Sequence, residues 1–159
     1  MIVLSQLIWD TLLEEFRWPR SAVERVAYID GISAGELQVA TTLTFPNAEM
    51  HPSYFTVSAE AMSEAGKHFR LFGMERIAQV HTHPGPRVKH SPFDDESAYS
   101  QTDGAVSIVI AQHARQRPSL TNCGVHVRDA NCWRCLTAAQ IEQAIRLVPG
   151  CLDFRRYAR

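Results

Sequence analysis

One stretch near the middle of the chain, Val80 to Asp95, constrains the fold more than any other feature. It reads V-H-T-H-P-G-P-R-V-K-H-S-P-F-D-D and contains three histidines, a serine and two aspartates. Imidazole and carboxylate groups at this density are typical of a metal site. The ligands can meet at one point only if the chain turns back on itself between the first histidine and the last aspartate.

The first half of the stretch continues a predicted strand over residues 75–83. Side chains two residues apart point to the same side of a strand, so His81 and His83 form a ready pair of metal ligands. Pro84 cannot donate a hydrogen bond to a neighbouring strand, and it is therefore expected to end this one.

The second half predicts the start of a helix. Ser91 followed by Pro92 is typical of an N-cap and a first helical residue, which places Asp94 in the first turn. Two histidines and one carboxylate make up the protein ligands of a catalytic zinc site, in which the fourth position is left for water.

The complete pattern, His81-x-His83-(seven residues)-Ser91-x-x-Asp94, resembles the signature of the JAMM/MPN+ (JAB-domain) metalloproteases residue for residue. Members of that family cut peptide and isopeptide bonds after ubiquitin-like modifiers. The resemblance implies that His81, His83 and Asp94 hold one Zn²⁺ ion. It further implies that Ser91 donates a hydrogen bond to the developing oxyanion.

A general base is also implied by the resemblance. In the family, a glutamate on the first strand stands seven residues before a glycine at the end of that strand, and Glu24 and Gly31 stand in this relation. Where the family often has a second glycine inside the strand, this chain has Ala27. Glu36, on the second predicted strand, is the alternative base.

The periodicity of apolar residues predicts the order of the elements. Helices are expected over 5–16, 58–72, 92–102 and 137–148, and strands over 23–29, 36–45, 54–57, 75–83, 105–111, 123–127 and 132–136. This order predicts an α/β fold, a single-domain sandwich with a central mixed β-sheet flanked by helices. The resemblance implies that the sheet is curved, in the JAB/MPN, cytidine-deaminase-like arrangement. We expect one domain over residues 1–159, with a core at about 21–136 and flanking helices at both ends.

Composition limits the binding partners and the cellular location that we expect. A net charge of -1 gives no electrostatic footprint for nucleic acid or an anionic membrane. No apolar run approaches the length of a membrane span, and the N-terminus lacks the basic region of a signal peptide. Four cysteines are too few for a disulfide scaffold of this length, so a reducing, cytoplasmic setting is expected.

Several residues near these motifs have competing interpretations. Cys123, His126, Cys132 and Cys135 would suffice for a second, structural zinc site, but a hairpin with thiols in the core explains them equally simply. His90 is interpreted as a loop residue and not a ligand. Asp95 lies next to the motif position and is expected to be solvated, with support of a ligand as the alternative.

Small size and the absence of insertions make the chain similar to compact bacterial JAB peptidases. Those are encoded beside E1-like, E2-like and ubiquitin-like proteins, including those of CBASS-type antiphage systems. The resemblance therefore implies deconjugation of a ubiquitin-like modifier, or processing of its precursor, with the modifier's C-terminal tail and its conjugates as partners. The alternatives are a sulfur-carrier-protein peptidase, a RadC-like protein, which the near-neutral charge disfavours, and a non-catalytic MPN scaffold.

Overall fold

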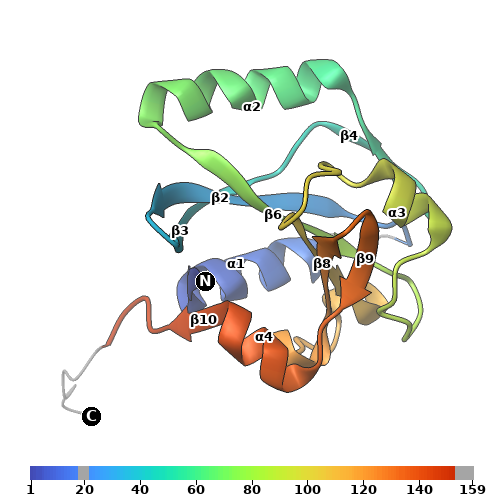
Figure 1. Cartoon of the computed structure of the whole chain (residues 1–159). Helices are drawn as coiled ribbons and strands as arrows, with labels where there is room; N and C mark the ends of the chain where they lie inside the picture. Colours follow the sequence, from blue (N-terminus) through green and yellow to red (C-terminus); the bar gives the residue numbers. More distant parts are fainter. Residues whose placement is uncertain (18–21, 153–159) are drawn as a thin grey trace, which may run out of the picture.

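The computed structural model describes residues 1–17 and 22–152, which are built around one mixed eight-stranded sheet (Figure 1). In spatial order its strands are β10 (Ile145–Val148), β1 (Ile2–Ser5), β3 (Leu37–Thr44), β2 (Val26–Ala34), β6 (Glu75–Thr82), β7 (Val106–Ile110), β8 (Gly124–Asp129) and β9 (Cys132–Cys135). Strand β1 runs parallel to β10 and β3, and β6 runs parallel to β7. The remaining neighbours are antiparallel.

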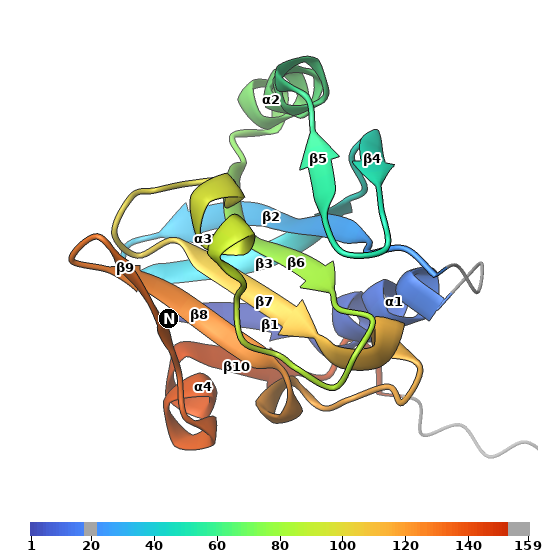
Figure 2. The ribbon, with the colours of Figure 1, turned by 90° about the vertical axis from the view of Figure 1, so that its right-hand side faces the viewer.

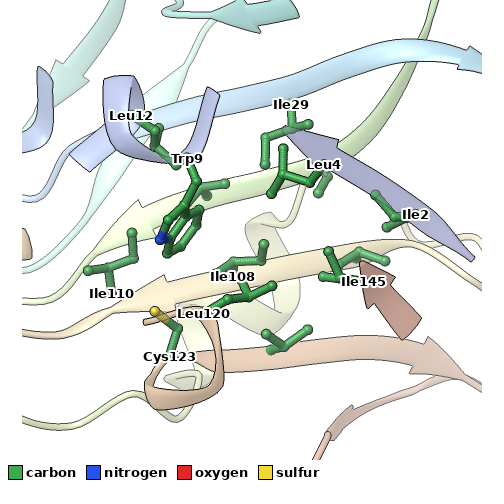
Figure 3. Packing of buried hydrophobic residues seen from close by; sticks show 14 of the residues in the cluster. Ile2, Leu4, Trp9, Leu12, Ile29, Ile108, Ile110, Leu120, Cys123 and Ile145 are labelled. Atoms are coloured by element: carbon green, nitrogen blue, oxygen red, sulfur yellow. The ribbon is translucent and has the colours of Figure 1, made fainter. Parts of the chain in front are cut away.

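Helices cover both faces of this sheet, which confirms the predicted α/β sandwich (Figure 1). Helix α2 (Ala59–Phe72) lies on one side, whereas α1 (Gln6–Arg17) and α4 (Ala138–Ala144) lie on the other. The main core forms between the sheet and α1. Figure 3 shows Trp9 of that helix beside Ile108 and Ile110 of β7, with Leu12 on the side of Trp9 away from that strand; all four side chains are buried.

Helix α2 begins and ends where the sequence predicts. Ser58 accepts a hydrogen bond from the backbone of Ala61, and Gly73 closes the helix in the left-handed conformation, at φ 62°. None of its residues is fully buried. The helix contacts the sheet through Met62, which packs against the buried cluster of Val26, Tyr28 and Phe55. Arg76 adds a second link, because its guanidinium lies 3.5 Å from the centre of the Tyr28 ring and 5.2 Å from that of Phe69.

The two strands at one edge of the sheet, β1 and β10, were not predicted. The last helix ends at Ala144, not near 148, and the chain continues as β10 in register with β1, with Ile2 opposite Ile145. Each segment is four residues long; β10 pairs with β1 from the far end of the chain, and β1 pairs with β3 as well. The predicted first helix corresponds to α1, and Trp18 and Pro19 beyond it lie outside the described residues.

Other boundaries of strands and turns also differ from the predicted ones. Gly31 lies inside β2 at a β-bulge, not in a turn, and a Cβ there would lie 2.0 Å from the Val39 carbonyl oxygen. The turn between β2 and β3 is at Gly35, with φ 65°. The predicted loop before residue 54 contains a short strand, β4 (Ala48–Met50), which pairs with β5 (Phe55–Val57) in a separate two-stranded sheet.

The region that follows β7 contains two short 3-10 helices, η1 (Ala111–Ala114) and η2 (Leu120–Asn122), where a loop was predicted. Helix α3 (Pro92–Ser97) ends five residues earlier than predicted, and Tyr99 then donates its backbone N–H to the Gln79 side chain. Across the described residues, no helix is long and apolar enough to cross a membrane.

Candidate metal centre

Three side chains converge at the end of the central strand β6. His81 Nε2 lies 3.2 Å from His83 Nε2, and these atoms lie 3.5 and 3.3 Å from the two carboxylate oxygens of Asp94. All three side chains are buried. Tetrahedral ligands placed about 2.0–2.1 Å from zinc lie roughly 3.3 Å from one another. The two Asp94 distances end on different oxygens, so the values do not define one tetrahedron, but one ligand atom from each residue lies within 4.8 Å of the others, close enough to hold a single ion.

The local structure explains how β6 supplies two of the three groups. Strand β6 lies between β2 and β7, with His81 opposite Val26 and Val109. Beyond the last strand residue, His83 still donates its backbone N–H to the Ile110 carbonyl at 2.9 Å. Extended backbone thus continues through His83 and puts both imidazoles on one side, as the spacing predicts.

The orientation of His83 suits a metal ligand. Its Nδ1 lies 3.0 Å from the Arg87 carbonyl oxygen, which can only accept a hydrogen bond. The proton is therefore on Nδ1, and the lone pair on Nε2 faces His81 and Asp94. Metal-bound histidines are commonly fixed in this way by a carbonyl or carboxylate on the other ring nitrogen.

The third group comes from the first turn of α3. Ser91 is the N-cap: its Oγ accepts from the Asp94 backbone N–H at 3.2 Å, and its own N–H donates to Asp94 Oδ2 at 2.6 Å. This reciprocal pair is a capping box with Pro92 at the first helical position, as the sequence predicts. Figure 2 shows the loop that carries the chain from the end of β6 back to α3.

Electrostatics keeps the Asp94 carboxyl charged. Burial acts to raise its pKa, but hydrogen bonds with His81 and His83 outweigh burial and hold the pKa well below the usual range of an aspartate. Burial lowers the pKa of His81, which therefore favours the neutral, ligating form. A carboxylate next to imidazole groups is the donor set that zinc accepts.

Glu24 lies beside this group. It precedes β2 by two residues instead of lying on the strand, and its backbone N–H donates to the His51 carbonyl at 2.7 Å. The side chain is buried, and Oε2 has no hydrogen-bond partner. Burial raises the pKa of Glu24 to about 7, with His83 lowering it and Asp94 raising it. The carboxyl is therefore able to gain and lose a proton near neutral pH.

The alternative base, Glu36, is far from this site. It lies in the exposed turn between β2 and β3, at the opposite end of β2 from Glu24. Eight strand steps from Val26 to Ala34, at about 3.3 Å each, separate the two ends of β2 by roughly 26 Å. The structure thus brings Glu24, and not Glu36, to the metal ligands.

The cysteine and histidine cluster does not assemble. Cys132 and Cys135 are exposed because β9 is an edge strand, so the prediction of core thiols is wrong for both and holds only for the buried Cys123. His126 instead stacks on His90. In residues 1–17 and 22–152, the one group of three or more potential ligands that meets at a point is His81, His83 and Asp94.

Sequence reasoning gave too little weight to His90 and Asp95. His90 does lie in a loop, but it is buried, and its Nδ1 lies 2.8 Å from Asp95 Oδ1. The Asp95 side chain is half exposed, as expected for a solvated group, yet it also holds this histidine. The only sequence signal for this contact was that His90 and Asp95 lie five residues apart, on either side of the capping-box residues Ser91 and Asp94.

Comparison with known proteins supports the fold. No family model matches the sequence. A stretch of 76 residues is 32% identical to a probable metalloprotease, y4jG, of Sinorhizobium fredii, and covers 47% of this chain and 46% of that protein. The match thus spans about half the length of this curated relative.

Two solved structures are similar throughout. Protein DSY2949 from Desulfitobacterium hafniense superimposes with a TM-score of 0.72 at 18% identity over 94% of both chains. A JAB1/MPN domain protein from Archaeoglobus fulgidus superimposes with a TM-score of 0.50 at 17% identity over 86% of this chain and 95% of that chain. These likenesses show a shared fold, the one that the sequence motif implies.

Proposed function

We propose that this protein is a zinc-dependent metallopeptidase that cleaves after the C-terminus of a ubiquitin-like modifier. One observation carries the proposal. Three potential ligands, with one atom from each within 4.8 Å of the others, meet beside Glu24, a buried carboxyl with an unpaired oxygen and a pKa of about 7. Perturbed carboxyls beside a ligand cluster are typical of hydrolytic sites.

In this proposal, His81, His83 and Asp94 hold the metal. A bound zinc ion supplies Lewis acidity and acidifies water. Glu24 accepts a proton from the attacking water and delivers it to the leaving amine, so that one water and one amide bond become a carboxylate and an amine. The raised pKa of Glu24 suits both transfers, because proton exchange is most efficient near the working pH.

Ser91 is the proposed oxyanion donor. Its Oγ accepts from the Asp94 backbone N–H, which leaves the hydroxyl proton free to donate. A donor of this kind contributes about 2 to 4 kcal/mol in comparable sites. In this proposal the same serine both orients the carboxylate ligand, through the capping box, and donates to the reacting carbonyl.

The modifier as substrate is supported by the strand beside the site. The Phe55 ring of β5 lies 5.4 Å from the His81 ring, and β5 pairs with β4 along one edge. Among the strands of the described chain, none pairs with its other edge. An extended C-terminal tail that adds to this edge by β-augmentation would place its scissile bond near the metal. Small residues at the end of the tail would suit a narrow channel.

The biological setting remains part of the proposal. We infer that the substrate is a conjugated or precursor form of a bacterial ubiquitin-like protein, and that E1- or E2-like proteins of a CBASS-type operon act with it. All four cysteines are free thiols, a state that the reducing cytoplasm maintains. Neither nucleic acid nor a membrane is expected as a partner.

The test combines metal content with cleavage. Purified protein is analysed for zinc and incubated with a linear fusion of ubiquitin to a reporter protein, and with ubiquitin-like proteins encoded by neighbouring genes. We expect about one zinc per chain, cleavage directly after the modifier, and loss of cleavage in Glu24→Ala with zinc retained. The matched control is Glu36→Ala, which should cut normally.

Four results would overturn the proposal, in whole or in part. Absence of bound metal removes the metallopeptidase assignment. Zinc binding without cleavage of any modifier fusion favours a scaffold, and cleavage of only a sulfur-carrier protein replaces the substrate. Equal rates for a tail that ends in small residues and one that ends in tryptophan would reject the narrow channel.

A further inference from the structure

The side chain of His90 lies next to the ligands, with its centroid 5.9 Å from that of His81, and the proposed chemistry does not use it. It is 4% exposed, and both ring nitrogens have partners. Nδ1 lies 2.8 Å from Asp95 Oδ1, and Nε2 lies 2.9 Å from the hydroxyl of Ser107, a fully buried residue of β7. A charged carboxylate only accepts, so the proton lies on Nδ1 and Nε2 accepts from the serine.

The ring is fixed on its faces and edges as well. It stacks on His126 of β8 at a centroid distance of 3.9 Å and an angle of 18°, and it meets the Trp133 ring of β9 edge-on at 5.2 Å. Its centroid lies 5.9 Å from that of His81. His90 therefore fills the space between the last three strands of the sheet and the metal ligands.

The backbone carbonyl of Asp95 also accepts hydrogen bonds from neighbouring segments. Its carbonyl accepts from Trp133 Nε1 at 3.3 Å and from Gln101 Nε2 at 2.9 Å. The bond between His90 and Asp95 thus closes a six-residue loop that is anchored to β7, β8 and β9. Inside this closed loop are the Ser91 hydroxyl and the Asp94 carboxylate.

Such an anchor is physically necessary for α3. The helix has six residues, and helices this short are not stable on their own because nucleation is unfavourable. The capping box orders the first turn but does not fix it relative to β6. The position of Asp94 against His81 and His83 therefore depends on contacts outside the helix.

We propose that His90 and Asp95 form a clasp that positions Asp94 and thereby sets the affinity for zinc. The clasp is the His90–Asp95 hydrogen bond together with its contacts to Ser107, His126 and Trp133. This inference rests on the proposed metal site. Both clasp residues act as positioning residues. His90 does not bind the metal, since both ring nitrogens are already engaged.

The decisive measurement is the zinc dissociation constant, determined by competition with a chromophoric chelator well below the unfolding temperature. The variants are His90→Ala, Asp95→Ala and the double variant, each compared with Glu96→Ala, an exposed acidic residue of the same helix whose side chain forms no hydrogen bond or ion pair in the described residues. Partners that orient a metal ligand typically contribute 10- to 100-fold to affinity. We expect a loss of that size in each single variant.

The double variant tests whether the two residues act as one unit. If they do, it should bind zinc no more than about twofold more weakly than the weaker single variant, because the first substitution already opens the clasp. His90→Asn keeps a donor near the Nδ1 position, so it should recover part of the affinity. The control Glu96→Ala should match the wild type.

Thermal unfolding of the zinc-free proteins separates positioning from a purely structural role. A structural role lowers the unfolding temperature but leaves the zinc affinity of folded protein unchanged, and that result would overturn the clasp. Should His90→Ala fail to fold, Asp95→Ala decides the question, since its side chain is half exposed. If wild type binds no zinc, the proposed function fails as well; if wild type binds and cuts while the variants bind equally, only the clasp fails.

Discussion

Replacing Glu24 with glutamine is expected to stop cleavage and, in zinc-free protein, to stabilise the fold at pH 8. Burial raises the pKa of this carboxyl from 4.5 to about 7, with His83 lowering it and Asp94 raising it. Between those pH values the folded state binds more protons than the unfolded state, so stability falls as pH rises through this window. Glutamine has the shape of the protonated acid and does not ionise.

The size of the effect follows from the pKa difference. At about 1.4 kcal/mol per pKa unit, a rise from 4.5 to about 7 destabilises the folded wild type by roughly 3 kcal/mol at pH 8, with most of the change between pH 5 and pH 8. For a chain of this size, 1 kcal/mol shifts the unfolding temperature by about 2–4 °C. Glu24→Gln should therefore unfold about 6–12 °C higher at pH 8, with a much smaller gain at pH 5.

The assay is thermal unfolding followed by circular dichroism in the presence of a chelator at pH 5, 7 and 8. Glu36→Gln is the matched control, because Glu36 is exposed in the turn between β2 and β3. A gain that does not grow from pH 5 to pH 8, or a loss at pH 8, would refute the reasoning that Glu24 is a buried carboxyl near the ligands. With zinc bound, the same variant should lose about 10²- to 10⁴-fold in cleavage rate.

Further predictions concern the loop, the core and the metal. A Cβ on Gly124 would lie 1.8 Å from the Val88 carbonyl oxygen, so Gly124→Ala should displace the ligand loop and weaken zinc binding in a chelator competition. The control Gly66→Ala should not, because a Cβ there would meet only the Arg70 guanidinium, at an ordinary contact distance of 3.7 Å. Asp30 forms a buried ion pair with Arg76 at 3.0 Å, and Asp30→Ala should cost about 3–5 kcal/mol in urea unfolding because the guanidinium loses its partner. An unchanged midpoint would show that the pair is not needed. Removing zinc should lower stability by about 2.7 kcal/mol relative to protein with free zinc at 100 times the dissociation constant, and identical melting curves would contradict a metal site.

Much of the candidate site was predictable because its signals are local. The two-residue spacing of His81 and His83 fixes their common side on any strand. The Ser91-Pro92 pair and Asp94 three residues after the serine define a capping box without reference to the rest of the chain. Helix α2 was predictable for the same reason, since its first and last residues are set by Ser58 and Gly73.

The parts that sequence reasoning missed depend on partners far away in the chain. The four residues from Ile145 to Val148 extend an apolar helical pattern, and they form a strand because β1 offers an open edge. Cys132 and Cys135 were predicted to be core thiols, but both are exposed because their strand lies at the edge of the sheet. Which strands pair, and which strand lies at the edge, depends on the whole sheet and cannot be recognised from a local pattern of residues.

The sequence by itself predicted the group of potential ligands, the helix that carries Asp94 and the α/β class, because backbone geometry turns short spacings into fixed directions. Only the tertiary structure decided that Glu24, and not Glu36, lies beside the ligands, and that its carboxyl is buried enough to hold a proton near pH 7. The same is true of His90, whose partners Ser107 and His126 come from separate strands. Burial and long-range contact depend on how the strands assemble, which residue spacing does not encode.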